Sequence, residues 1–236
     1  MKQPGWLSLV SLREVGPIAV LGIIAFGLLG FAELADEVFE HKTHSFDTAI
    51  LTFLRMPEDT STPIGPPWLL NALTDITALG GYAVLTLLTL GAAAYRLVRN
   101  DRAGALVIAA AVGSGALLGN LLKLGFDRPR PDIVEHLTHA ASSSFPSGHA
   151  TLAAATYLTL GALIARGQPN RSLKALVLSG AILITILVGF SRVYLGVHWP
   201  TDVLAGWCLG AAWAALWWLV LLRLKPSIEE TRSANT

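Results

Sequence analysis

The chain has 236 residues, of which 53% are hydrophobic and only 14% charged, and its mean hydropathy is +0.57. Soluble domains carry about 25% charged residues, so the composition excludes an ordinary soluble domain and indicates a protein embedded in a membrane. The formal net charge of +1 gives no excess that would favour nucleic acid, and a single cysteine, Cys208, excludes an intramolecular disulfide.

The first apolar run, residues 15–35, follows Lys2 and Arg13 and is similar in layout to a secretory signal peptide. It is longer than the apolar region of such a peptide, and no clear small-residue cleavage site follows it. We therefore predict an uncleaved first membrane helix.

Six apolar runs are long enough to cross a bilayer, which takes about 20 residues of helix. They cover residues 15–35, 74–97, 103–124, 150–167, 173–191 and 202–224. Since the sequence contains no internal repeat, we predict an all-α integral membrane bundle of six transmembrane helices, forming one domain over residues 1–236. Small residues in the third and fourth runs are expected to let helices pack closely: Gly113, Gly115, Gly119, Ala153, Ala154 and Ala155.

Residues 36–73 form the longest connection between apolar runs. Within this segment, apolar residues recur at helical spacing, namely Phe46, Ile50, Phe53 and Leu54. This spacing predicts an amphipathic helix, either lying on the outer membrane interface or packed against the bundle. Prolines then interrupt the chain from Pro63 to Pro67, and Trp68 is expected to anchor the interface.

The positive charges separate into two groups when six spans are assumed. Eleven of the 17 Lys and Arg residues fall on one side: Lys2, Arg13, Arg96, Arg99, Arg102, Arg166, Arg171, Lys174, Arg223, Lys225 and Arg232. The other six are Lys42, Arg55, Lys123, Arg128, Arg130 and Arg192. Because cytoplasmic loops are enriched in Lys and Arg, both termini are expected in the cytoplasm.

With six spans and cytoplasmic termini, the connections after the third and fifth runs both lie on the outer face. They bring three polar segments together there: residues 123–131, 144–149 and 191–202. They contribute Lys123, Arg130 and Arg192, three cations at one membrane level, and this arrangement favours an anion site. Asp127 and Asp132 are close enough in sequence to neutralise part of the charge. Contact with lipid headgroups is the alternative explanation for the cations alone.

The segment Pro146-Ser147-Gly148-His149 directly precedes an apolar run. Backbone N–H groups at a helix start point towards an anion, and Gly148 allows the backbone to approach it closely. Ser147 adds a hydroxyl donor, and His149 in the first turn is placed to protonate a leaving group. For His149 considered alone, an interfacial side chain is the alternative.

In the third segment, Asp202 follows His198 by four residues. A carboxylate at this spacing can hold one imidazole nitrogen while the other acts as a nucleophile or base. Helix capping by Asp202, after Pro200 and Thr201, is the competing explanation. The other reading of the whole segment is an ordinary polar loop.

Together, Lys123-x6-Arg130-Pro131, Pro146-Ser147-Gly148-His149 and Ser191-Arg192-x5-His198-x3-Asp202 resemble the three-part signature of the type 2 phosphatidic acid phosphatase (PAP2) superfamily. The resemblance implies a metal-independent phosphatase with a phosphohistidine intermediate. In it, His198 would attack phosphorus, Asp202 would orient His198, and His149 would protonate the leaving oxygen and then activate water. The other signature residues would bind the phosphate: Lys123, Arg130, Ser147, Gly148 and Arg192. Arg128 lies outside the signature, and its replacement is expected to matter less than that of Lys123 or Arg192.

The resemblance implies no metal or other cofactor, and His136 and His139 lack the acidic partners of a metal site. The expected partners are the bilayer and a lipid phosphate or diphosphate. By the resemblance, the preferred substrates are undecaprenyl diphosphate, phosphatidylglycerophosphate and phosphatidic acid, and diacylglycerol diphosphate and lipid A 1-phosphate are further candidates. The alternatives are a lipid phosphotransferase of the same superfamily and a non-catalytic lipid-phosphate binding or transport protein. The expected location is a bacterial cytoplasmic membrane, with the active site facing outward.

Overall fold

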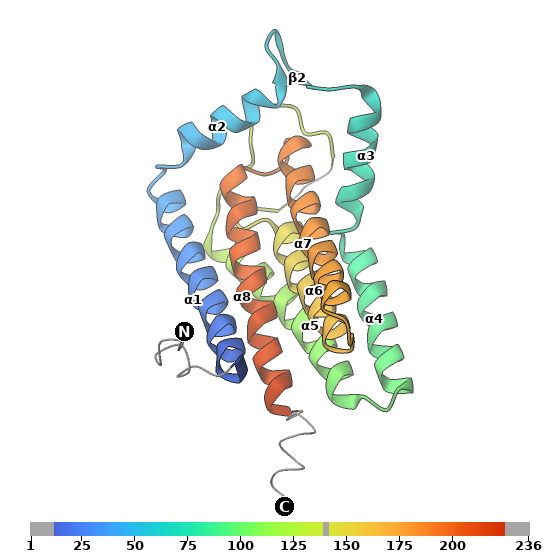
Figure 1. Cartoon of the computed structure of the whole chain (residues 1–236). Helices are drawn as coiled ribbons and strands as arrows, with labels where there is room; N and C mark the ends of the chain where they lie inside the picture. The colour runs from blue at the N-terminus through green and yellow to red at the C-terminus, as the bar shows by residue number, and fades with distance from the viewer. Residues whose placement is uncertain (1–11, 139–141, 225–236) are drawn as a thin grey trace, which may run out of the picture.

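The computed structural model describes residues 12–138 and 142–224 as a bundle of long helices with a small hairpin at one end (Figure 1). The helices in chain order are α1 (Leu12–Phe39), α2 (His44–Phe53), α3 (Pro67–Ala78), α4 (Tyr82–Val98), α5 (Arg102–Gly125), α6 (Gly148–Arg166), α7 (Arg171–Tyr194) and α8 (Pro200–Leu224). Two short antiparallel strands, β1 (Arg55–Met56) and β2 (Asp59–Pro63), lie between α2 and α3.

Among the described residues, five helices are long and apolar enough to cross a membrane: α1, α5, α6, α7 and α8. The pair α3 and α4 meets the same test as one unit, although the chain bends by 49° between the two helices. The predicted all-α membrane bundle is therefore confirmed, with five spans among the described residues, or six where the bent pair counts as one span. The predicted continuous helix over residues 74–97 is wrong, because helix already begins at Pro67 and breaks between Ala78 and Tyr82.

The central helix is α6, which packs against α5, α7 and α8. Glycines on α8 allow this helix to come very close to α6. A Cβ atom at Gly210 would lie 2.5 Å from the Ala154 Cβ, and one at Gly206 would lie 2.9 Å from the Ala150 Cβ. Since a larger side chain would separate the two helices, this four-residue glycine spacing sets how near the starts of α6 and α8 lie to each other.

The glycines predicted to pack closely in α5 behave differently from one another. A Cβ atom at Gly115 would lie 3.2 Å from the Trp213 ring, whereas one at Gly113 or Gly119 would meet nothing within 4 Å. By contrast, Ala153, Ala154 and Ala155 of α6 are fully buried, as expected of a helix at the centre of the bundle. The small residues therefore predicted the closely packed positions correctly in α6, but in α5 only Gly115 lies at a close helix contact.

The segment after α1 contains the expected helix, α2, and an additional hairpin that the sequence analysis did not predict. The side chain of Asp59 caps the turn, accepting hydrogen bonds from the Ser61 amide at 2.9 Å and from the Thr62 hydroxyl at 2.6 Å. On α2, Phe46 and Phe53 are exposed, while Asp47 faces inward. Contact of this helix with a membrane interface stays a prediction.

The two chain ends of the helical bundle lie at the same end of the molecule. In Figure 1 the first turn of α1 and the last turn of α8 are at the bottom, and α2 and the hairpin are at the top. The connections from α5 to α6 and from α7 to α8 also lie towards the top. The fold thus gathers the polar segments of the sequence at one end of the bundle.

Candidate active site

Direct contacts join the three polar segments. The amide of Ser147, at the start of α6, donates to the carbonyl of Asp202 in the first turn of α8 at 3.0 Å. The Arg130 guanidinium donates to the carbonyl of Val197 at 2.5 Å, and the Ser144 amide donates to the carbonyl of Arg128 at 2.9 Å. Residues about seventy positions apart in the sequence therefore form one site, as the parity of the spans predicted.

The imidazole of His198 lies in the short connection between α7 and α8 and is only 1% exposed. Its Nδ1 lies 3.4 Å from Oδ2 of Asp202, and its Nε2 lies 3.3 Å from Nη1 of Arg130. Because a carboxylate accepts and a guanidinium donates, these partners favour the tautomer with the proton on Nδ1. The lone pair of Nε2 then points towards the cationic side of the site.

Burial lowers the pKa of His198 to about 4, because a charged imidazole loses its hydration there. Asp202 acts in the opposite direction, and the nearby guanidinium groups of Arg130 and Arg192 add to the lowering of the pKa. The imidazole is consequently neutral at pH 7 and has a lone pair available for attack.

Asp202 is fully buried in the first turn of α8, and four groups share its carboxylate. Oδ2 faces Nδ1 of His198 and also accepts the Trp199 amide at 2.9 Å and the Ser144 hydroxyl at 2.8 Å. Oδ1 accepts from Arg128 at 2.5 Å. Oδ2 thus makes the contacts that both alternatives require. From the third position of the helix it accepts the backbone N–H of the residue before the helix, and it also faces the imidazole.

Several donors surround the lone-pair side of His198. The Arg192 side chain is 3% exposed, and its Nη1 donates to the Thr77 hydroxyl at 3.1 Å. Its Nε has no hydrogen-bond partner. Lys123 donates through Nζ to the Ser142 hydroxyl at 3.0 Å and to the Ser143 carbonyl at 3.1 Å. A buried donor without a partner costs free energy, so Arg192 Nε marks a place where an acceptor would be stabilised.

The start of α6 provides donors of a second kind. Ser147 occupies the N-cap position, but its side chain makes no capping hydrogen bond, and its buried hydroxyl has no partner. Gly148 begins the helix next to Lys123, with 3.7 Å between its ideal Cβ position and Cε of the lysine. His149 follows and is half-buried. The unpaired N–H groups of this first turn and the free Ser147 hydroxyl suit an anion.

Arg128, which lies outside the signature, holds both ion pairs that join α2 to the start of α8; the smaller effect expected of its replacement stays a prediction. It donates to Asp202 on one side and to Asp47 Oδ2 at 2.7 Å on the other. The acidic residues that pair with this cation are therefore distant in sequence, whereas its neighbours Asp127 and Asp132 are exposed.

The structure shows no group of three or more potential metal ligands among its described residues. Nε2 of His136 lies 2.6 Å from the carbonyl of Pro131, a contact within its own loop. His139 lies outside the described residues.

Known proteins resemble this chain in sequence and in fold. A family model described as the PAP2 superfamily matches residues 104–226. Phosphatidylglycerophosphatase B of Bacillus subtilis is 37% identical over 184 residues, which make up 77% of this chain and 86% of that protein. The lipid A 1-phosphatase of Rhizobium johnstonii is 32% identical over 161 residues, or 60% of this chain and 62% of that protein. The crystal structure of a transmembrane PAP2 type phosphatidylglycerolphosphate phosphatase from Bacillus subtilis superposes with a TM-score of 0.71 at 32% identity, covering 88% of this chain and 98% of that one.

The chain belongs to the PAP2 superfamily. It is a multi-pass membrane protein and a metal-independent lipid phosphatase. The predictions of family, fold class and enzyme class are confirmed. The comparisons test neither the role of each site residue nor the membrane face on which the site lies, and both remain proposals.

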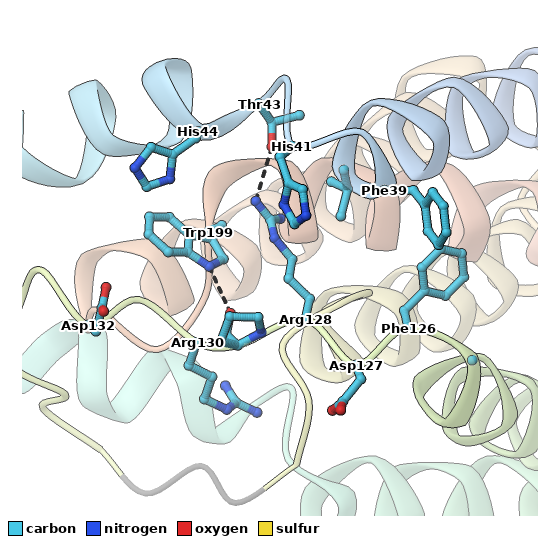
Figure 2. Close-up of a pocket in the computed structure, with 13 residues that line it drawn as sticks. Phe39, His41, Thr43, His44, Phe126, Asp127, Arg128, Arg130, Asp132 and Trp199 are labelled. Atoms are coloured by element: carbon cyan, nitrogen blue, oxygen red, sulfur yellow. Dashed lines mark hydrogen bonds between the residues drawn. The ribbon is translucent and has the colours of Figure 1, made fainter.

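A cleft of about 680 Å³ opens beside the site of this PAP2 phosphatase (Figure 2). It lies between the end of α1, the start of α2 and the segment that follows α5. Phe39 and Phe126 line its apolar part, whereas His41, Asp127 and Arg130 line its polar part. Arg130 lines the cleft and also contacts His198, so this arginine lies between the cleft and the buried imidazole.

Sequence reasoning missed two groups of this PAP2 site, Asp47 and Ser144. The signal for Asp47 was present, because it shares the inward face of α2 with Leu51 and Leu54 at helical spacing. A carboxylate on an apolar helix face requires a polar partner. Ser144 carried no comparable signal, since a serine in a loop is ordinary.

Proposed function

We propose that this protein removes a phosphate group from a membrane lipid through a phosphohistidine formed on His198. The observation that carries the proposal is a buried, neutral imidazole held between Asp202 and Arg130, with the unpartnered donors of Arg192 and Ser147 close by. Phosphoryl transfer depends mainly on positioning and charge stabilisation, and this arrangement supplies both.

In the first step, Nε2 of His198 attacks phosphorus and the bond from phosphorus to the lipid oxygen breaks. His149 gives its proton to that oxygen, so the lipid leaves as an alcohol, or as a monophosphate when the substrate is a diphosphate. In the second step, water attacks the phosphohistidine, His149 takes the proton of that water, and inorganic phosphate is released. Asp202 keeps its contact with Nδ1 and stabilises the positive charge that develops on the ring.

The cationic and N–H donors are assigned to the oxygens of the phosphate. Lys123, Arg130 and Arg192 neutralise the developing charge. Ser147 and the backbone N–H groups at Gly148 complete the set at the start of α6. Donors that are already fixed in place need no reorganisation during the reaction, and removing one such donor typically costs a factor of about 10² to 10³ in rate.

The preferred substrate is phosphatidylglycerophosphate. It is the substrate named for the Bacillus subtilis relative and for the solved structure that covers 88% of this chain. The lipid part beyond the scissile phosphate is assigned to the cleft, whose aromatic residues Phe39 and Phe126 adjoin polar groups near the imidazole. Undecaprenyl diphosphate, phosphatidic acid and lipid A 1-phosphate are the competing substrates.

The experiment measures phosphate release by the purified protein from a panel of these four lipids, with and without EDTA, beside the variant His198→Ala. Release should be fastest from phosphatidylglycerophosphate, unchanged by EDTA and lost in the variant. Equal release by both proteins would refute the nucleophile. Transfer of phosphate to an added alcohol, with little free phosphate, would favour the phosphotransferase, and binding without turnover would favour the transport protein.

The intermediate can be tested separately. With lipid carrying labelled phosphate, a rapidly denatured sample should hold protein-bound label that is released by acid, as expected for a phosphorus–nitrogen bond. His149→Gln should gain the label slowly, because the first step lacks its acid, and should then lose it slowly in a chase with unlabelled lipid, because the second step lacks its base. Label on the His198→Ala protein would contradict the assignment.

We also propose that the site faces outward from the cytoplasmic membrane and that both termini are cytoplasmic. The support is the excess of cations at the opposite end of the spans, among them Arg96, Arg99 and Arg171. In a Cys208→Ala background, a membrane-impermeant maleimide applied to intact cells should label Glu58→Cys in the hairpin but not Arg99→Cys. The reverse pattern would overturn the orientation.

A further inference from the structure

Asp47 is a fully buried carboxylate on a helix that contains no residue of the family signature. It lies on the inward face of α2, with an exposed fraction of 0%. Its Oδ1 accepts the Thr201 amide at 2.9 Å. Its Oδ2 accepts the Thr201 hydroxyl at 2.7 Å and Nη2 of Arg128 at 2.7 Å. A buried charge with this many well-placed partners has a specific structural task.

Arg128 connects this carboxylate to the one beside His198. Its Nη2 bonds Asp47, and its Nη1 bonds Oδ1 of Asp202 at 2.5 Å. The Thr201 hydroxyl, 2.9 Å from Nη1, and the face of Trp199, 5.5 Å from the guanidinium carbon, fix the plane of the arginine. Figure 2 shows the Arg128 side chain extending between the loop after α5 and Thr43 at the start of α2, to which it also bonds.

The two oxygens of Asp202 therefore have separate partners. Arg128 holds Oδ1, so that Oδ2 remains directed at Nδ1 of His198, at 3.4 Å. If Arg128 were absent, the carboxylate could rotate, and both oxygens would compete for the Ser144 hydroxyl and the Trp199 amide. The orientation of the imidazole would then be less well defined.

We propose that Asp47 and Arg128 are positioning residues that act through Asp202 to orient His198 for attack. The inference rests on the proposed function, in which His198 is the nucleophile. Neither residue is assigned to the phosphate. Helix α2 thus contributes to the chemistry a carboxylate that the signature motifs do not contain.

The opposite charges of Asp47 and Arg128 should affect the protonation of His198 in opposite directions. The groups that face His198 are Asp202 from α8, Arg130 from the loop after α5, Arg192 from α7 and His149 from α6. Behind Asp202, the charges of Asp47 and Arg128 cancel. Removing Arg128 leaves additional negative charge near the imidazole and favours its protonation, whereas removing Asp47 leaves additional positive charge and disfavours protonation.

The test compares the wild type with Asp47→Asn, Arg128→Gln and the double variant, using phosphatidylglycerophosphate in detergent micelles. We expect kcat to fall about 10- to 100-fold in each single variant, as is typical when a supporting partner is removed, with little change in KM. The acid limb of kcat/KM should move to higher pH for Arg128→Gln and to lower pH for Asp47→Asn. In the double variant it should return towards the wild-type position.

Asp75→Asn and Arg99→Gln, two exposed positions away from the site, are matched charge controls that should keep wild-type profiles. Thermal unfolding of each variant reports the folded fraction, and the double variant leaves the net charge of the Asp47, Arg128 and Asp202 group unchanged. Losses explained entirely by unfolding, or acid limbs that do not move in opposite directions, would overturn the proposal. If His198→Gln is inactive while both single variants match the wild type, the role of Asp47 and Arg128 is refuted and the nucleophile stands. If His198→Gln is active, the proposed function itself is refuted.

Discussion

Gly80 lies against the imidazole of His149. A Cβ atom at Gly80 would be 3.3 Å from Cδ2 of His149 and would overlap the Val188 side chain on α7. The position is in the break between α3 and α4, and its φ is not in the left-handed region, so backbone strain does not account for the glycine. The bend between α3 and α4 therefore places a residue without a side chain directly against His149, the histidine assigned as the proton donor.

Replacing Gly80 by Ala should push Val188 aside, shift His149 by a few tenths of an ångström and lower kcat by up to about 10-fold, because the rate depends steeply on the placement of a catalytic group. Initial rates of phosphate release measure the effect. Gly91→Ala is the matched control, since a Cβ atom there would meet nothing within 4 Å. An active Gly80→Ala protein would show that Val188 yields in place of the histidine.

Ser147→Ala should lower kcat about 10²-fold with little loss of stability, since the hydroxyl makes no hydrogen bond in the free protein and is assigned to the phosphate. Kinetics together with thermal unfolding separate the two effects. Thr159→Val is a matched control, because this buried hydroxyl on α6 also has no partner and is not assigned to the site. Equal activity losses for both variants would contradict the assignment of Ser147.

Gly210→Val should destabilise the protein by about 1–3 kcal/mol, because an added side chain overlaps Ala154 and Thr151 at the contact of α6 with α8. Thermal unfolding followed by tryptophan fluorescence would show a lower midpoint. Gly113→Val on α5, where a Cβ atom has open space, should have a much smaller effect. Similar midpoints for both variants would refute the close contact.

The free energy of unfolding should depend on pH through the titration of His198. Its folded pKa of about 4 lies below the unfolded value of 6.5, so the unfolded chain binds more protons between these two pH values. Stability therefore rises as the pH increases from 4 to 6.5 and is lost as the pH falls through that window. Over this window the titration of His198 changes the free energy of unfolding by about 3 kcal/mol in total.

Unfolding midpoints of the wild type and of His198→Gln, measured from pH 4 to pH 8, check this prediction. The variant should lose the steepest part of the dependence over that window, and above pH 7 the two curves should run parallel. Identical slopes for both proteins would show that other groups govern the acid instability.

The sequence by itself determined the membrane bundle and the residues of the signature. Apolar runs long enough to cross a bilayer predict helices, because hydrocarbon excludes unpaired polar backbone; the run over residues 74–97 is the one that the structure breaks. Polar side chains at the ends of those runs cost free energy in a membrane unless they have a function. Lys123, His149 and His198 are therefore recognisable as site candidates from the sequence. The parity of the spans then brought them to the same end.

Only the tertiary structure decided how the site is held. Asp47, Arg128 and Asp202 come from three separate parts of the chain, and their pairing depends on where α2 packs, which no local pattern encodes. The break at Gly80 and the contact through Gly210 are likewise matters of distance between neighbouring helices. Hydropathy and spacing describe one helix at a time, whereas the orientation of His198 is set by groups that meet only when the helices pack together.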